Sequence, residues 1–249
     1  MTQPTVPRTG SVSGALAPGM FDAVLFDAGG VLVLPDPTVL GPLLAPYGGS
    51  TDIAVHRRAH YAAMAAKSRA AAGEMEWEVY DAAYVEQVGV AREHAEHAAV
   101  LLNRTRTALL WRWPIPETLA ALADLAARGV PMGVVSNAAG QVEAELARAG
   151  VCQVGEGLCV GMRVIVDSTV VGVAKPDPAI FDHALPCFAG IPRERIAYVG
   201  DSVTMDVAGA TAAGLHPVLI DPYDDHAGLE FAGRVVTRIG SVGDLLAAV

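Results

Sequence analysis

A small group of polar residues could together act on a phosphate group. They are carboxylates, a hydroxyl group, a carboxamide and an amine, contributed by Asp27, Ser136, Asn137, Lys175, Asp201 and Asp206. Carboxylate oxygens are the ligands that hard divalent cations such as Mg²⁺ prefer. Hydroxyl and backbone N–H groups can bind phosphate oxygens, and a lysine can neutralise charge on a phosphoryl group. These residue types therefore predict a metal site beside a phosphate-binding site.

Several of these polar residues lie where predicted strands end. The apolar runs are residues 21–26 before Asp27, 132–135 before Ser136 and 196–200 before Asp201. Further strands are predicted at 164–166 and 218–220, with helices between successive strands. Strands that alternate with helices predict parallel pairing and right-handed crossovers. Because open parallel sheets bind ligands outside the carboxyl ends of their strands, we expect the polar residues to gather at one edge.

The segment between the first two of these strands has a different character. Residues 52–72, 75–88 and 91–112 are rich in Ala, Glu and Arg and predict three helices with little strand signal. We therefore expect an α/β fold in which residues 20–33 and 114–249 form a doubly wound parallel sheet. A small all-helical cap at 34–113 interrupts this core. The first 19 residues (1–19) contain three prolines and three glycines and predict a flexible tail.

Composition narrows the classes of partner. The chain has 249 residues, of which 52% are hydrophobic and 18% charged, as is typical of a globular protein. A formal net charge of −10 disfavours nucleic acid, but a small phosphorylated metabolite stays compatible because a bound cation and one lysine can reverse the field locally. No apolar run reaches the roughly 18 to 20 residues that cross a bilayer, so no membrane partner is expected. Three cysteines without CxxC spacing predict reduced thiols and a cytoplasmic location.

Four motifs in a fixed order add a family resemblance. They are Phe26-Asp27-Ala28-Gly29-Gly30, Val135-Ser136-Asn137, Ala174-Lys175-Pro176-Asp177-Pro178, and Gly200-Asp201-Ser202 followed by Asp206. Their order and spacing resemble the haloacid dehalogenase superfamily over about residues 20–220. The commonest members of that superfamily are magnesium-dependent phosphatases that work through an aspartyl-phosphate, so the resemblance implies Mg²⁺ as the cofactor.

The resemblance assigns a metal-binding role to four positions. It implies that Asp27 is both the nucleophile and a Mg²⁺ ligand. The backbone carbonyl of Gly29 and the carboxylate of Asp201 would be further ligands. Asp206 would orient a ligand water or the catalytic lysine.

The same resemblance assigns the contacts with substrate. Ser136, Asn137 and Gly30 would bind the phosphate group, and Lys175 would neutralise charge between the nucleophile and the phosphoryl group. Asp177 and Pro178 predict a helix start that would aim the lysine in one direction. The cap would close over this site, exclude water and select the substrate.

One position departs from the family pattern. Phosphatases of this family usually carry a second Asp two residues after the nucleophile, and this chain has Gly29 there. That second Asp protonates the leaving group and later activates water, help that is typically worth about 10²- to 10⁴-fold. Restoring an Asp at position 29 should therefore raise turnover of poor leaving groups more than that of aryl phosphates.

Three functions of different class follow from this departure. The favoured one is a phosphatase acting on a small phosphorylated metabolite. Either the substrate has a good leaving group, or the cap supplies a proton donor to the enzyme. The second is a phosphate- and metal-binding regulatory protein with little or no turnover. The third is a metal-independent 2-haloacid dehalogenase in which Asp27 attacks carbon. No motif names the substrate, and the chain is expected to be a monomer or a homodimer.

Histidine pairs and aromatic residues offer weaker candidates. The pair His56 and His60 and the pair His94 and His97 could each share a helix face, but neither pair has a third ligand in pattern. We interpret both pairs as structural or solvated. The aromatic residues of the predicted cap are expected to pack within it rather than contact a substrate, with a cap aromatic that faces the cleft as the alternative; they are Trp77, Tyr80, Tyr84, Trp111 and Trp113.

Overall fold

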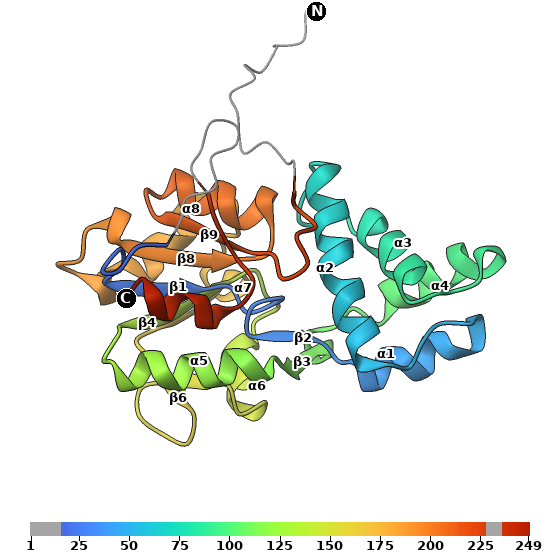
Figure 1. Ribbon diagram of the computed structural model, residues 1–249, viewed down its shortest axis with the longest axis horizontal. Helices are drawn as coiled ribbons and strands as arrows, with labels where there is room; N and C mark the ends of the chain where they lie inside the picture. Colours follow the sequence, from blue (N-terminus) through green and yellow to red (C-terminus); the bar gives the residue numbers. More distant parts are fainter. Residues whose placement is uncertain (1–15, 228–235) are drawn as a thin grey trace, which may run out of the picture.

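A six-stranded parallel sheet forms the centre of the molecule (Figure 1). The computed structural model describes residues 16–227 and 236–249. The strands lie in the order β10 (Thr237–Ile239), β9 (His216–Ile220), β8 (Ile196–Gly200), β1 (Ala23–Phe26), β4 (Met132–Ser136) and β7 (Ile165–Asp167). Every neighbouring pair is parallel, which confirms the predicted sheet. Most of the predicted tail, residues 1–15, lies outside the described residues.

Helices cover both faces of this sheet, and the central strand β1 shows why. Val24 and Phe26 pack on one side, in a cluster that includes residues of α5 (Pro116–Ala127) and η8 (Val242–Ala247). Ala23 and Leu25 alternate with them and pack on the other side, with residues of η4 (Pro178–His183) and α8 (Ala208–Ala212). Because a strand buried on both faces must be apolar throughout, β1 has no alternating polar pattern.

Four helices, α1 to α4, lie between β1 and β4 in the chain and together form the helical insertion. They are α1 (Pro37–Leu44), α2 (Ile53–Arg69), α3 (Glu78–Gln87) and α4 (Ala95–Arg104). The insertion lies to one side of the sheet, with α2 nearest to it (Figure 1). It has its own hydrophobic cluster, which contains Leu40, Tyr80, Tyr84 and Leu102.

The ends of the insertion differ from the sequence prediction. The predicted helix over 91–112 stops at Arg104, and the chain then forms η3 (Ala108–Leu110) and the strand β3 (Trp111–Pro114). β3 pairs antiparallel with β2 (Val33–Pro35), so the backbone groups there are used in a two-stranded sheet rather than a helix. This pair of strands joins the insertion to the core.

The first helix of the insertion, α1, was not predicted. Pro35-Asp36-Pro37 has the composition of a break, but it starts a helix. The Asp36 carboxylate accepts a hydrogen bond from Thr38 N at 2.9 Å, and Pro37 occupies the first helical position. Both features are favourable at a helix N-terminus, because the first N–H groups have no partner within the helix.

Two short turns, η1 (Ala45–Tyr47) and η2 (Arg92–His94), lie within the insertion. The elements that connect the strands of the core include α6 (Val142–Arg148), β5 (Cys152–Val154), β6 (Val160–Met162), α7 (Ser168–Val171), η5 (Leu185–Phe188), η6 (Arg193–Arg195) and η7 (Val203–Val207). The helix predicted from Pro178 is a pair of short 3₁₀ turns, η4 and η5, and Pro186 at the start of η5 cannot donate a backbone hydrogen bond. The helix after Ser202 begins with one π-helical turn, η7.

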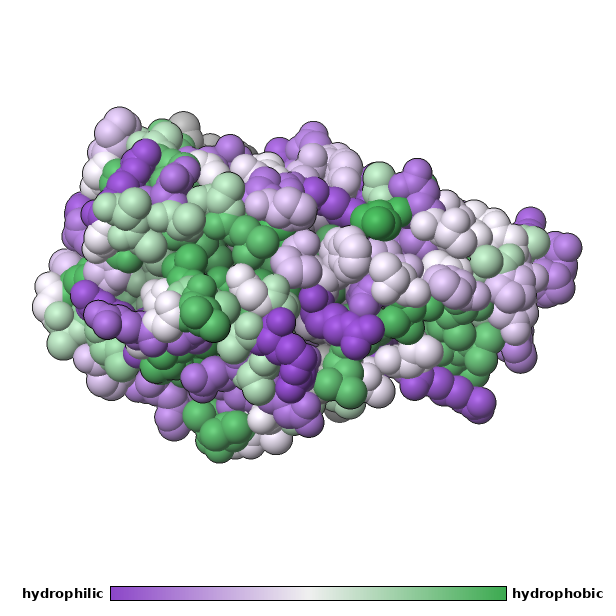
Figure 2. Space-filling model, turned by 90° about the horizontal axis from the view of Figure 1, so that it is seen from below, coloured by the Kyte–Doolittle hydropathy of each residue, from purple (hydrophilic) through white to green (hydrophobic). Residues whose placement is uncertain are grey.

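Hydrophilic and hydrophobic side chains are interspersed over the face shown in Figure 2. None of the described helices is both long enough and apolar enough to cross a bilayer.

Candidate active site

The predicted site residues gather at the carboxyl end of β1. Asp27 directly follows this strand, and its backbone N donates to the carbonyl of Val199 in β8 at 2.8 Å. β1 lies between β4 and β8, so Ser136 at the end of β4 and Asp201 after β8 flank Asp27. From β1 the chain goes on to β4 on one side, and from β8 it goes on to β9 on the other side. Open α/β sheets bind ligands at such a point, where the strand order reverses.

Three carboxylates converge here. Asp27, Asp201 and Asp206 each offer an oxygen atom, and these atoms all lie within 4.8 Å of one another. Asp201 and Asp206 are almost fully buried, whereas Asp27 is partly exposed to the cavity described below. Like charges held this close in a buried space repel each other, so the cluster requires positive charge.

Lys175 supplies part of that positive charge. Its Nζ lies 2.9 Å from Asp27 Oδ1 and 2.7 Å from Asp206 Oδ1, and it donates to the hydroxyl of Tyr198 at 2.8 Å. Burial acts to lower the pKa of Lys175, but the carboxylates of Asp206 and Asp27 outweigh it and raise the pKa. The lysine is therefore a fixed positive charge beside Asp27.

Asn137 holds the backbone of this lysine in place. Its Nδ2 donates to the carbonyl of Lys175 at 3.0 Å, and its Oδ1 accepts from the Lys175 N–H at 2.7 Å. The same Nδ2 donates to the Glu74 carboxylate at 3.0 Å. The side chain of Asn137 is thus used to position Lys175, a role that the sequence interpretation missed.

Asp206 has both oxygens engaged by the protein. Oδ1 accepts from Lys175, and Oδ2 accepts from the backbone N of Asp201 at 3.1 Å and of Ser202 at 2.9 Å. Gly200 makes this possible, because a Cβ there would lie 2.2 Å from Asp206 Cγ. These contacts suit Asp206 to orienting the lysine and the loop that carries Asp201.

The donor set fits a divalent cation held by Asp27 and Asp201. Burial raises the pKa of Asp206, and although Lys175 opposes this, the charges of Asp27 and Asp201 add to the rise. The site thus carries more negative charge than one ammonium group neutralises. Hard cations such as Mg²⁺ take oxygen ligands and keep several waters, so two carboxylates with the Gly29 carbonyl would suffice.

The helical insertion reaches this cluster through α2. His60 Nε2 lies 2.9 Å from Asp201 Oδ2, and His60 Nδ1 lies 2.9 Å from the Tyr80 hydroxyl. The next residue, Tyr61, donates its hydroxyl to the carbonyl of Gly30 at 2.8 Å. We had interpreted His60 as structural or solvated, and nothing local in the sequence indicated that it would contact a residue 141 positions away.

Gly30 is required where Asp201 and His60 approach the backbone. Its φ is +69°, and a Cβ built on it would lie 1.9 Å from Asp201 Oδ2 and 2.7 Å from His60 Nε2. Gly30 is not among the residues that line the cavity next to Asp27. Its predicted contact with substrate therefore stays a prediction, while its observed role is to leave room for Asp201.

A cavity of about 420 Å³ opens above Asp27 between the core and the insertion. Core residues that line it include Asp27, Ser136, Asn137, Lys175 and Asp201; residues between β2 and β3 include Met64, Lys67, Glu74, Trp77 and Arg106, and Trp111 of β3 also lines it. The space is therefore large enough for a small metabolite, and the chemical groups predicted for phosphate chemistry face it.

Trp111 lies close to the point where a side chain at position 29 would begin. A Cβ added at Gly29 would lie 3.0 Å from Trp111 Cζ3 and 3.2 Å from Trp111 Cε3. The indole also packs edge-on against the His60 ring, with centroids 5.5 Å apart. Trp77 and Trp111 pack against the cluster of the insertion, as expected, and they also line the cavity, which is the alternative that the sequence leaves open for a cap aromatic residue.

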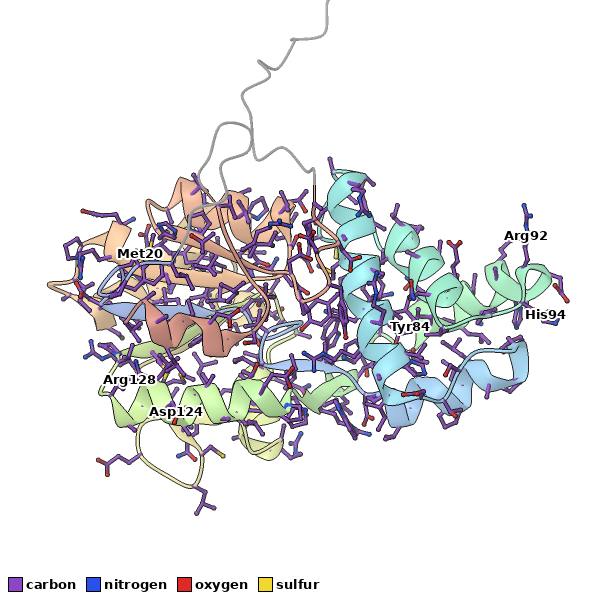
Figure 3. All side chains as sticks on the ribbon, in the orientation of Figure 1. Met20, Tyr84, Arg92, His94, Asp124 and Arg128 are labelled. Carbon is purple, nitrogen blue, oxygen red and sulfur yellow. The ribbon has the colours of Figure 1, made fainter. Side chains whose placement is uncertain are left out.

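Other aromatic and histidine residues of the insertion lie away from the site. Tyr84 lies inside the insertion (Figure 3), as expected, and its hydroxyl contacts His56 Nδ1 at 2.8 Å. His94 lies at the tip of the insertion farthest from the sheet (Figure 3). It therefore cannot take part in the site at the end of β1.

Comparison with known proteins identifies the family. The chain belongs to the haloacid dehalogenase-like hydrolases, whose family model matches residues 21–214. It is 35% identical over 138 residues to a phosphoserine phosphatase of Thermus thermophilus, which covers 55% of this chain and 51% of that protein. It is 34% identical over 138 residues to a glyceraldehyde 3-phosphate phosphatase of Methanothermobacter thermautotrophicus, covering 53% and 57%. The chain spans about half the length of these curated relatives.

Solved structures show the same fold over nearly the whole chain. A HAD phosphatase from Thermococcus onnurineus is similar with a TM-score of 0.53 and 21% identity, covering 90% of this chain and 96% of that one. The L-2-haloacid dehalogenase RSc1362 is similar with a TM-score of 0.52 and 20% identity, covering 91% and 97%. One fold thus carries both phosphatase and dehalogenase chemistry, and only the site can separate them.

Replacing Gly30 by alanine tests the packing of the site. Gly30 (φ +69°) and Gly129 (φ +72°) share a left-handed backbone, but a Cβ at Gly129 meets nothing within 4 Å. Gly129→Ala should therefore lose about 1 kcal/mol of unfolding free energy from backbone strain alone. Gly30→Ala should lose at least about 2 kcal/mol more, because Asp201 and His60 must move. Urea unfolding measures both losses, and equal losses would contradict the close approach of Asp201 to Gly30.

Proposed function

We propose that this protein is a magnesium-dependent phosphatase that hydrolyses a small phosphorylated metabolite through an aspartyl-phosphate on Asp27. The observation that carries the proposal is the placement of Asp27 beside Lys175 and Asp201 at the floor of the cavity. A partly exposed carboxylate is available for attack, and a fixed cation lies next to it. The phosphatase names of the relatives support the same chemistry, although each match covers about half of the relative.

In the first step an oxygen of Asp27 attacks the phosphorus of the substrate. The new bond joins this oxygen to phosphorus, and the bond between phosphorus and the ester oxygen breaks with its electron pair leaving on the alcohol. Lys175, 2.9 Å from Asp27 Oδ1, neutralises charge that develops on the phosphoryl oxygens. Mg²⁺ bound by Asp27 and Asp201 would add Lewis-acid neutralisation of the same oxygens.

In the second step water attacks phosphorus in the aspartyl-phosphate. The bond between phosphorus and the Asp27 oxygen breaks, which releases inorganic phosphate and restores the carboxylate. Gly29 can neither protonate the departing alcohol nor activate this water, and Trp111 lies against the point where a side chain at position 29 would begin. The preferred substrates are therefore ones with a leaving group of low pKa, or ones protonated by another group.

Glu74 is the carboxylate that the segment between β2 and β3 brings to the cavity. It accepts a hydrogen bond from Asn137 Nδ2 at 3.0 Å, so it lies against the end of β4. A glutamic acid in this position could carry the leaving-group proton that Gly29 cannot carry. This matches the alternative in which a proton donor comes from the cap.

The acidic cluster favours a phosphatase over a dehalogenase. A dehalogenase of this family would use Asp27 to attack carbon without a metal, so it would not need carboxylates arranged to hold a cation. Here Asp201 and Asp206 lie within 4.8 Å of the nucleophile and raise the need for a cation.

The nucleophile assignment is tested by Asp27→Asn. We expect release of phosphate from p-nitrophenyl phosphate that requires Mg²⁺ and falls at least about 10³-fold in Asp27→Asn. Asp22→Asn is the matched control, because Asp22 is an exposed residue just before the same strand, where it pairs with Arg195. It should leave the rate unchanged. Metal-independent halide release from 2-chloropropionate would show a dehalogenase instead, and phosphate binding without turnover would show a binding protein.

The role of Gly29 is tested together with Trp111. Because Trp111 lies 3.0 Å from the place of a new Cβ, Gly29→Asp alone should not raise turnover, which revises the prediction made from the sequence. Gly29→Asp combined with Trp111→Ala should raise turnover of alkyl phosphates at least about tenfold over Trp111→Ala alone. Turnover of aryl phosphates, whose leaving groups need little protonation, should change much less. Equal gains for both substrate classes would contradict the assignment of a missing acid.

A further inference from the structure

The two lysines of this chain both line the cavity above Asp27. Among 249 residues there are only two lysines, Lys67 and Lys175, beside fifteen arginines. Both lysine side chains are buried, with 3% and 2% of their surface exposed, and both line the cavity. Lys175 has a role in the proposed reaction, but Lys67 does not. A buried ammonium group that the reaction does not use needs another explanation, because burying a charge is costly.

Lys67 lies on the face of α2 that looks toward the core. His60, Met64 and Lys67 are spaced by four and then three residues, so they share one face of the helix. His60 contacts Asp201, which fixes the direction of this face. Seven residues of helix separate His60 from Lys67 by about 10 Å along the axis. Lys67 thus faces the cavity about two helical turns beyond the contact between His60 and Asp201.

The ammonium group of Lys67 has incomplete compensation. It donates to the carbonyl of Glu74 at 2.8 Å and lies 3.7 Å from the ring centroid of Trp77. The ion pairs formed by the described residues include none at Lys67, and the nearby Glu74 carboxylate is bound to Asn137. Burial lowers the pKa of Lys67, with the charge of Glu74 acting in the opposite direction.

Arg106 brings a second cation to the same place. Its guanidinium carbon lies 4.0 Å from the ring centroid of Trp77, and it lines the same cavity. One edge of the guanidinium pairs with Asp81, while Nε is buried without a hydrogen-bond partner within the described residues. Lys67 and Arg106 thus bring two cationic groups to the cavity. Asp81 pairs with Arg106, and the Nε of Arg106 remains as an unused donor among the described residues.

We propose that Lys67 and Arg106, held at Trp77, form a second anion-binding subsite in the cavity. This subsite binds a carboxylate or a second phosphate group at the end of the substrate opposite the phosphoryl group that Asp27 attacks. The inference rests on the proposed phosphatase function and names its substrate class: phosphomonoesters that carry a second anionic group. Trp77 and Met64 provide an apolar wall for the part of the substrate between the two anions.

A purely structural role for Lys67 makes a different prediction. Its bond to the carbonyl of Glu74 ties the end of α2 to the turn that follows, and loss of that bond alone would lower stability. It would not make the enzyme distinguish substrates by charge. The decisive measurement is therefore a ratio of kcat/KM values between substrates that differ only in the remote group.

Three aryl substrates provide this ratio: phenyl phosphate, 4-carboxyphenyl phosphate and 1,4-phenylene bisphosphate. We expect the wild type to prefer the carboxylate or the bisphosphate to phenyl phosphate by at least about tenfold, the value of one charged hydrogen bond. The two charged substrates distinguish a carboxylate from a phosphate as the preferred remote group. Lys67→Met should reduce the preference to within about twofold, and Lys67→Arg should retain it.

Arg69→Met is the matched control for general electrostatics. Arg69 is exposed, lies two residues further along α2 and does not line the cavity, so this variant removes the same charge from the same helix. It should keep the wild-type preference. A wild type without preference for either charged substrate, or an Arg69→Met variant that loses the preference as Lys67→Met does, would overturn the subsite.

A binding measurement separates this inference from the proposed function. With ¹³Cε-labelled lysine the chain gives two side-chain signals, which the Lys67→Met spectrum assigns. Titration with 4-carboxyphenylphosphonate should shift the Lys67 signal, whereas phenylphosphonate should not, and both should shift Lys175. A Lys67 signal that responds equally to the two phosphonates overturns the subsite even if turnover is observed. A selective Lys67 shift in a protein without turnover would overturn the phosphatase function and support the subsite.

Discussion

The structure of this site depends on negative charge gathered at the carboxyl ends of two adjacent strands, β1 and β8. Asp27, Asp201 and Asp206 lie within 4.8 Å of one another, and Lys175 contacts the first and the last of them. Coulomb repulsion in a space of low dielectric would drive these groups apart if no cation balanced them. The supporting contacts serve to keep them together: Tyr198 and Asn137 fix the lysine, and the backbone N–H groups of the β8 loop fix Asp206.

The helical insertion is part of this arrangement rather than a separate cover. His60 and Tyr61, adjacent residues of α2, contact Asp201 and the Gly30 carbonyl. These contacts set the insertion over Asp27 and bring Lys67 and Trp77 to the opposite wall of the cavity. Gly29 is part of the same arrangement, because Trp111 lies close to it and also packs against His60. A side chain at position 29 would therefore meet the aromatic wall of the cavity.

Much of the core could be predicted from the sequence, because its signals are local. Apolar runs gave the strands, and Asp177 caps the turn after Lys175 by accepting from Ala179 N at 2.9 Å, as its position before Pro178 indicates. The contacts of His60 and Trp111 could not be predicted. They join residues far apart in the chain, and no periodicity distinguishes a buried histidine that contacts the core from one that packs within a helix pair. The sequence did not predict α1 because Asp-Pro is favourable both in a loop that ends an element and at the start of a helix.

The converging carboxylates should hold one divalent cation between Asp27 and Asp201. Calorimetric titration of the substrate-free protein with Mg²⁺ tests it most directly, because it requires no turnover. We expect one binding event per chain for the wild type and an affinity at least about tenfold lower for Asp201→Asn. Absence of binding by the wild type, or equal affinity for both proteins, would contradict it.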